Sequence, residues 1–87
     1  MNGEICLCDI DVSERAQVTA LTAEGSIRRR FLDIGLVPGT RIECVGKSPC
    51  GDPSAYLIRG AVIAIRREDA AHILVKKYQG GEDGTYK

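Results

Sequence analysis

The side chains of this chain with the clearest capacity for metal chemistry are its cysteines and its single histidine. Cys6, Cys8 and Cys50, together with His72, are ligands of the kind that hold zinc or ferrous iron. Cys6 and Cys8 are separated by one residue, however, whereas the paired cysteines of structural zinc sites are separated by two to four. Because the spacing does not match, we assign no metal ligand from the sequence. A module that binds or senses iron or zinc through its cysteines is kept as the alternative hypothesis.

The remaining cysteine and the state of the thiols follow from simple patterns. Cys44 alternates with Ile42, which predicts that it packs in the core as a small apolar side chain. The first residues contain neither the basic segment nor the apolar run of a signal peptide. We therefore expect a cytoplasmic protein whose thiols are reduced rather than joined in disulfides.

A run of three arginines is the strongest local concentration of charge: Arg28, Arg29 and Arg30. Such a run commonly does no more than solvate a helix face. Three consecutive arginines cannot all form ion pairs on one side of a helix, so at least one is left to contact a partner. The functional interpretation of the three arginines is therefore a docking surface for an acidic partner.

An apolar turn follows the arginines, with Leu36, Val37 and Pro38 between Gly35 and Gly39. Both glycines are expected to serve the backbone conformation. Leu36 either folds into the core or joins Val37 in a contact with a partner. We include Leu36, Val37 and Pro38 with the arginines as candidate partner-binding residues.

Two further turns separate the later strands. Gly51, Asp52 and Pro53 form the tip of a loop in which Asp52 is expected to bond to nearby backbone. Arg59 and Gly60 have the form of a tight hairpin turn.

Composition and motifs argue against several classes of function. The phosphate-binding pattern GxxxxGK[ST] and a serine in a nucleophile elbow are both absent, and one histidine limits acid–base chemistry. The 12 basic and 12 acidic residues cancel, which disfavours nucleic-acid binding because phosphate contacts need concentrated positive charge. No apolar run approaches the roughly 20 residues of a membrane helix. We expect a protein-binding module rather than an enzyme, a nucleic-acid binder or a membrane-inserted protein.

The 87 residues suffice for one compact domain, which we place at residues 1–78. In the first dozen residues, one helical turn would place Leu7 and Ile10 on the core. Strand patterns occur at residues 16–22, 40–45, 55–58, 61–65 and 73–75. Closely spaced short strands favour a partly closed β-barrel, which leaves few exposed edges. Residues 79–87 contain three glycines and no aliphatic side chain, which predicts a flexible C-terminal tail.

One short helix is predicted after the first strand. Ser26 is a suitable N-cap, because its hydroxyl can accept a hydrogen bond from a free backbone N–H. Ile27, Phe31 and Ile34 then recur on one helical face, and Gly35 ends the helix. A further turn of helix is expected just before the last strand.

Three segments together resemble the FeoA family. The first is RRRFLDIGLVPGTRIE at residues 28–43, a basic stretch and short helix with a Leu-x-Pro-Gly turn into a strand. The second is GDPSAYLIRG at 51–60, a Gly-Asp-Pro loop before a strand that ends in Arg-Gly. The third is AVIAIRREDAAHILV at 61–75, an apolar strand, a basic pair and a closing strand. Order and spacing match over residues 7–75, whereas the two cysteines of ICLCDI and the charged tail depart from the family's pattern.

The resemblance implies a mainly β fold, an SH3-like small β-barrel of about five strands with one or two short helices. A similar domain forms the C-terminal part of DtxR-type repressors. The resemblance also implies a small cytoplasmic accessory protein of bacterial ferrous iron transport. It would bind FeoB, a membrane transporter with a cytoplasmic GTPase domain, and modulate its assembly, GTPase or transport cycle. Attachment to the inner membrane would then occur only through FeoB. No cofactor is implied, and a weak homo-oligomer is left open.

Overall fold

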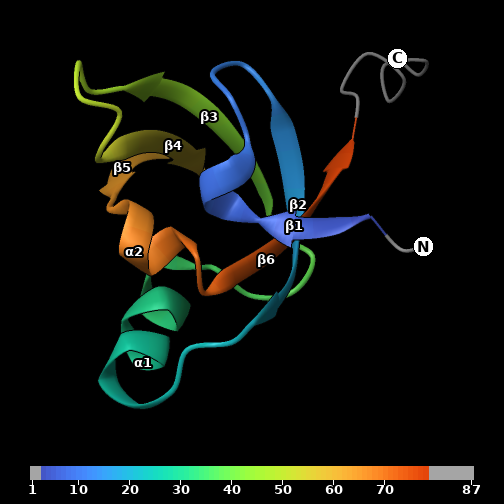
Figure 1. Cartoon of the computed structure of the whole chain (residues 1–87). Helices are drawn as coiled ribbons and strands as arrows, with labels where there is room; N and C mark the ends of the chain where they lie inside the picture. Colours follow the sequence, from blue (N-terminus) through green and yellow to red (C-terminus); the bar gives the residue numbers. More distant parts are fainter. Residues whose placement is uncertain (1–2, 79–87) are drawn as a thin grey trace.

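The fold is a strongly curved antiparallel sheet with two short helices, as the computed structural model of residues 3–78 shows (Figure 1). Residues 1–2 and 79–87, including the predicted tail, lie outside the described residues. The elements in chain order are β1 (Glu4–Cys6), a 3-10 helix η1 (Leu7–Asp9), β2 (Arg15–Leu21), α1 (Gly25–Ile34), β3 (Arg41–Lys47), β4 (Ser54–Ile58), β5 (Ala61–Ile65), α2 (Arg67–Ala70) and β6 (Ile73–Tyr78). The strands pair in the order β1-β6-β2-β3-β4-β5, and every pair is antiparallel.

The predicted mainly β architecture is confirmed, but the structure has six strands where about five were expected. The additional strand is β1, which pairs with β6 so that Cys6 lies opposite Leu74. Three residues are too few to show the alternation that reveals a strand in a sequence. β6 also continues beyond the predicted end at Val75, because the backbone of Lys76 and Lys77 pairs with β2 whatever the polarity of their side chains.

The core fills the inside of the curved sheet. Its largest fully buried side chains include Tyr56 of β4, Phe31 of α1 and Leu7 of η1. The predicted helical turn near the N-terminus is confirmed as η1, which buries Leu7 and is followed by the fully buried Ile10. Cys44 of β3 is also fully buried, as its alternation with Ile42 predicted.

The start of α1 differs from the prediction. Ser26 does not cap the helix, because α1 begins at Gly25 with Glu24 in the N-cap position and no side-chain capping bond. Gly25 has a φ of +68°, so the chain turns into the helix one residue earlier and Ser26 falls within the first turn.

The face and the end of α1 agree with the prediction. Phe31 is buried, and Ile27 and Ile34 are partly buried against the core. Gly35 has a φ of +106° and ends the helix, where its N–H donates to the carbonyl oxygens of Phe31 and Leu32.

The apolar strand β5 lies at an edge of the sheet. Only Ile65 of its five residues is buried, and Val62 is 65% exposed. No strand among residues 3–78 pairs with the outer edge of β5, so the barrel stays open between β5 and β1. The predicted tight turn before β5 is confirmed, since Arg59 and Gly60 have φ values of +52° and +87°.

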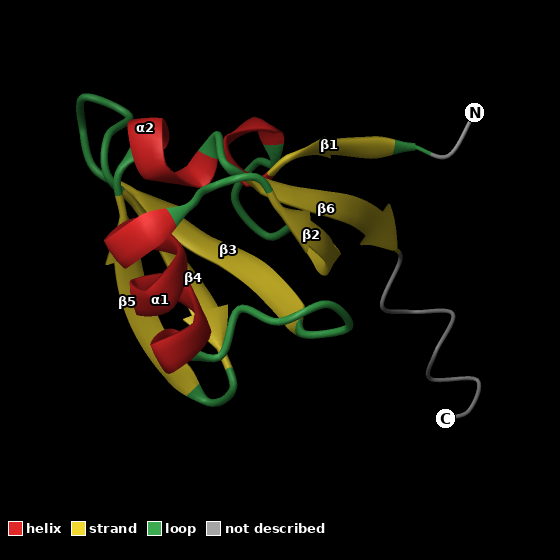
Figure 2. Cartoon of the chain, turned by 90° about the horizontal axis from the view of Figure 1, so that it is seen from below, coloured by secondary structure: helices red, strands yellow, loops and turns green. Residues whose placement is uncertain are grey.

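The two helices lie on the side of the barrel away from the start of β1 and the end of β6 (Figures 1 and 2). An ion pair between Arg30 Nη2 and Asp69 Oδ2, 3.1 Å apart, links α1 to α2. The backbone N–H of Arg67 at the start of α2 donates to the Asp52 carboxylate at 2.9 Å. Asp52 therefore stabilises a distant helix end, whereas the sequence predicted only a local role in its turn. No helix in the described part of the chain is long and apolar enough to cross a membrane.

Candidate functional site

The three arginines of the predicted docking surface lie on the exposed side of α1. The side chains of Arg28, Arg29 and Arg30 all face solvent. Arg30 is engaged with Asp69 of α2. Within residues 3–78, Arg28 and Arg29 make no ion pair, so α1 presents two guanidinium groups that are available to a partner.

The apolar turn after α1 divides into a buried and an exposed part. Leu36 is fully buried, and its N–H donates to the carbonyl oxygen of Phe31 at 2.9 Å. Leu36 is therefore removed from the candidate docking residues, because a side chain inside the core cannot contact a partner. Val37 is 37% exposed and Pro38 is exposed, so both remain candidates.

Two further residues belong to this side of the molecule and were missed in the sequence. Leu32 is 38% exposed and follows Arg28 and Arg29 by four and three residues, which places it on the same helical face. Arg59 lies over the C-terminal end of α1, because a Cβ at Gly35 would meet the Arg59 side chain. Helical spacing signals Leu32 in the sequence, whereas only the fold brings Arg59 to α1.

We call the set Arg28, Arg29, Leu32 and Arg59 the α1 surface. Its three guanidinium groups form no ion pair with any other residue that the structure describes, and its leucine is exposed. Cations near a helix C-terminus are also favoured by the helix dipole, which suits Arg59. An acidic partner with an apolar contact point is the ligand that this chemistry fits.

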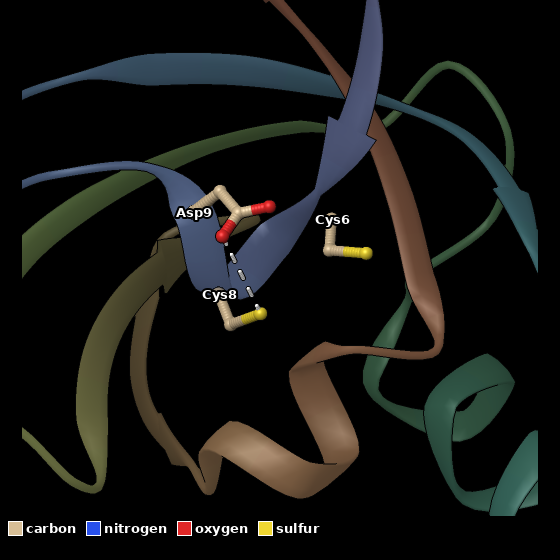
Figure 3. A group of neighbouring side chains, drawn as sticks. All are labelled: Cys6, Cys8 and Asp9. Atoms are coloured by element: carbon tan, nitrogen blue, oxygen red, sulfur yellow. Dashed lines mark hydrogen bonds between the residues drawn. The ribbon is translucent and has the colours of Figure 1, made fainter.

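A second group of side chains, which could ligate a metal ion, lies near the N-terminus. The Sγ atoms of Cys6 and Cys8 and a carboxylate oxygen of Asp9 all lie within 4.8 Å of one another (Figure 3). We call these three residues the thiol cluster. The sequence had grouped Cys6 and Cys8 with Cys50 and His72 and had not included Asp9, which the turn of η1 places beside Cys8.

The other soft side chains lie elsewhere. Cys50 is exposed in the loop after β3 and Cys44 is buried. His72 Nδ1 lies 3.3 Å from the hydroxyl of Thr22. None of these three joins a group of metal-ligating side chains among residues 3–78.

The environment of Cys8 raises the pKa of its thiol above the ordinary value of 9.0. Partial burial is the main cause, and the neighbouring Asp9 carboxylate and Cys6 add to it. Arg67 of α2 acts in the opposite direction. The free thiol is therefore protonated at neutral pH and is not an activated nucleophile.

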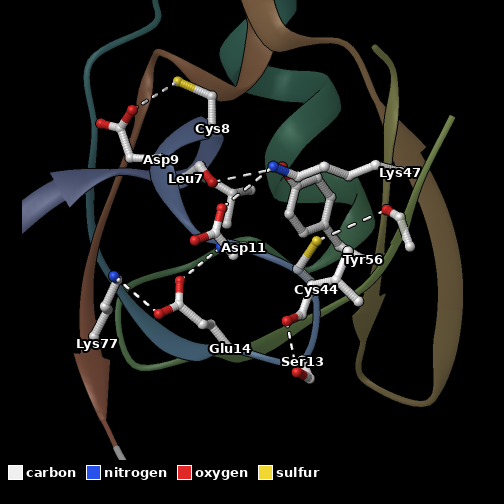
Figure 4. A network of polar contacts seen from close by, with 12 residues as sticks. Leu7, Cys8, Asp9, Asp11, Ser13, Glu14, Cys44, Lys47, Tyr56 and Lys77 are labelled. Carbon is white, nitrogen blue, oxygen red and sulfur yellow. Dashed lines mark hydrogen bonds and ion pairs between the residues drawn. The ribbon is translucent and has the colours of Figure 1, made fainter. Parts of the chain in front are cut away.

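A network of polar contacts supports the backbone next to the thiol cluster (Figure 4). The carbonyl oxygen of Leu7, between the two cysteines, accepts from the Ile10 N–H at 3.2 Å and from the Tyr56 hydroxyl at 3.5 Å. The Glu14 carboxylate accepts from the Asp11 N–H at 2.6 Å and from Lys77 Nζ at 3.1 Å. These bonds tie η1 and the loop after it to β4 and β6.

Comparison with known proteins identifies the family. The FeoA domain model matches residues 5–77. The chain belongs to the FeoA family. The match includes nearly every described element, from β1 to β6.

A curated FeoA relative is the Fe(2+) transport protein A/Fe(2+) transporter FeoB fusion protein of Porphyromonas gingivalis. It is 34% identical over 70 residues, which cover 80% of this chain but only 8% of the fusion protein. The chain therefore corresponds to a small part of that relative.

Solved FeoA structures show the same fold. The NMR structure of an FeoA-like protein from Clostridium acetobutylicum is 34% identical, with a TM-score of 0.83 and coverage of 91% of this chain and 92% of that one. The crystal structure of Stenotrophomonas maltophilia FeoA complexed with zinc, described as an SH3 domain protein, is 25% identical with a TM-score of 0.74. The two chains are covered to 83% and 89% in that comparison. The SH3-like fold expected from the resemblance is confirmed.

The expected relation to metal-dependent repressors is also found. A manganese-dependent transcriptional repressor shares the fold over 90% of this chain and 44% of its own, with a TM-score of 0.79. At 16% identity the likeness extends to the fold alone.

Proposed function

We propose that this protein is an accessory protein of ferrous iron transport that binds FeoB and modulates its assembly, GTPase or transport cycle. The observation that carries the proposal is the P. gingivalis relative, in which a domain 34% identical to this chain is joined to FeoB. A covalent link keeps two domains at a high local concentration, which favours contact between them.

The α1 surface is the part of the molecule best suited to this contact. Arg28 and Arg29 form no ion pair within the described residues, and Leu32 of the same helix is exposed to solvent. Complementary charge speeds association and orients partners, while an exposed apolar side chain supplies area to bury. Val37 and Pro38 extend this side of the molecule with apolar atoms.

Binding alone can alter the transport cycle only if the protein has different affinities for two states of FeoB. The two states that we propose are FeoB with and without bound guanine nucleotide, because the resemblance to the FeoA family implies a FeoB partner with a GTPase domain. We expect no hydrolysis of GTP by this chain alone.

Weak self-association of the protein stays a prediction.

Binding should be measured with the purified protein against the cytoplasmic GTPase region and full-length FeoB of the same source, with and without guanine nucleotide. We expect nucleotide-dependent binding that Arg28→Glu/Arg29→Glu weakens about tenfold, since two favourable charges become repulsive. Absence of binding to both the GTPase region and full-length FeoB, in every nucleotide state, would contradict the proposed function.

A matched control separates a specific docking surface from a general effect of charge. Lys76 is exposed on β6, where it pairs with Glu4 of β1 and Gln17 of β2, so Lys76→Glu is compared with Arg28→Glu and Arg29→Glu singly. We expect the control to bind FeoB within about twofold of the unmodified protein, because long-range charge effects are screened by salt. Equal losses for all three variants would exclude the α1 surface as the docking site.

A further inference from the structure

The ligand atoms of the thiol cluster are close to the spacing of a metal site. The two Sγ atoms and the Asp9 oxygen all lie within 4.8 Å of one another, and Cys8 Sγ is 4.0 Å from Asp9 Oδ1. Tetrahedral zinc, with Zn–S of about 2.3 Å and Zn–O of about 2.1 Å, holds its ligand atoms roughly 3.5 to 3.8 Å apart. The ligand atoms therefore exceed the tetrahedral spacing by no more than roughly 1.3 Å.

The backbone holds these side chains without help from a metal. Cys6 is fixed by the pairing of β1 with β6, opposite Leu74. Leu7 and Ile10, on either side of Cys8 and Asp9, are fully buried and anchor η1 to the core. The three ligands are thus presented by a rigid turn, which lowers the entropy lost when they bind an ion.

Neither thiol is enclosed by the core, although Cys8 packs against its edge. Cys6 and Cys8 are only partly buried, unlike Cys44, which fills the core. The contact from the Cys8 thiol to Asp9 Oδ1 is long, at 4.0 Å. Asp9 is exposed, so an ion could enter from solvent on that side.

We propose that Cys6, Cys8 and Asp9 bind one divalent metal ion of the borderline class, Zn²⁺ or Fe²⁺, with a fourth position open to solvent or to a donor from another molecule. Two thiolates favour these ions over Mg²⁺ and Ca²⁺, which prefer oxygen ligands. Structural zinc sites have four protein ligands, whereas a site with three protein ligands keeps its fourth position for water or another donor, as catalytic zinc sites do. The site needs no contact with FeoB, so it stands apart from the proposed docking function.

Binding must displace protons. Each thiol enters the site as a thiolate, so one ion releases two protons when both cysteines are protonated beforehand. The number of protons released per bound ion therefore equals the number of protonated thiols that become ligands.

The test uses the full chain without a histidine tag, reduced and under anaerobic conditions. Titration with Co²⁺ should give thiolate-to-cobalt charge-transfer absorption that saturates at one ion per chain, with about two protons released per ion. Zn²⁺ and Fe²⁺ are then added as competitors to rank the two ions. We expect Cys6→Ser/Cys8→Ser to abolish the absorption and Asp9→Asn to weaken binding at least tenfold.

Cys50→Ser is the matched control, because Cys50 is an exposed thiol outside the cluster. It should leave Co²⁺ binding unchanged. Binding retained in Cys6→Ser/Cys8→Ser, lost in Cys50→Ser, or saturating at one ion per two chains would overturn the proposal. If the double cysteine variant does not fold, Asp9→Asn carries the test, since Asp9 is exposed and outside the core.

Discussion

Single residues of this protein take roles that depend on partners distant in the chain. Arg59 closes a hairpin turn and also covers Gly35 at the end of α1. Asp52 stabilises the start of α2 through the Arg67 N–H. The sequence predicts the turn in both cases, because turn preference is local, but it does not reveal the second contact.

Glu14 also contacts a residue distant in the chain, Lys77, and this contact makes the stability of the fold depend on pH. Hydrogen bonds from the Asp11 N–H and from Lys77 lower the pKa of its carboxyl group below the ordinary value of 4.5. A folded-state pKa below the unfolded one contributes stability above the unfolded pKa, and this contribution is lost as the pH falls through the folded pKa. We expect Glu14→Gln to be less stable than the unmodified protein at pH 7, with the difference narrowing as the pH falls below 4.5 and through the folded-state pKa.

Urea unfolding between pH 3 and pH 7 measures this difference. Glu24→Gln is the control, because Glu24 is exposed and forms no ion pair with the other residues that the structure describes. A Glu14→Gln deficit that is the same at every pH would show that the carboxylate charge is not its cause.

Among the secondary-structure elements, α1 is predicted by its hydrophobic periodicity, whereas the turn that follows it is not. The spacing of Ile27, Phe31 and Ile34 correctly predicts the helix face that meets the core. The turn after it has no periodicity, so the sequence leaves open whether Leu36 folds into the core or joins Val37 in a contact with a partner. Only the packing of α1 against the barrel decides that one is buried and the other is exposed.

Leu36 and Val37 should therefore respond very differently to truncation. We expect Leu36→Ala to lower the free energy of unfolding by about 2–5 kcal/mol, because it leaves a cavity in the core. Val37→Ala should change it by roughly 0.5 kcal/mol. Urea unfolding checks both, with Leu36→Met as a volume-conserving control that costs less than about 1.5 kcal/mol. A Leu36→Ala variant as stable as Val37→Ala would contradict the burial of Leu36.

At the scale of the whole molecule, the sheet is an open barrel with β1 and β5 at its edges. β6 lies between β1 and β2, so its backbone is paired on both sides. β5 pairs only with β4 among the described strands and exposes Val62. Edge strands of this kind are places where another strand can add.

Amide hydrogen exchange should follow this arrangement. We expect the amides of β2 and β6 to exchange slowest and the β5 amides that do not donate to β4 to exchange fastest. Measurement by NMR in deuterated buffer at low protein concentration tests the order. Slow exchange of those β5 amides would contradict an open edge, and protection that grows with concentration would place the predicted weak homo-oligomer there.

The family, most of the strands, the α1 face and the hairpin turn at Arg59 and Gly60 could all be predicted from the sequence. These features depend on periodicity and on residues adjacent in the chain, which a single sequence displays directly. The tertiary structure alone decided that Arg59 joins α1, that Leu36 is buried and that Asp9 completes a cluster with Cys6 and Cys8. Such contacts depend on the curvature of the sheet and on where β1 pairs, and no local pattern encodes either of them.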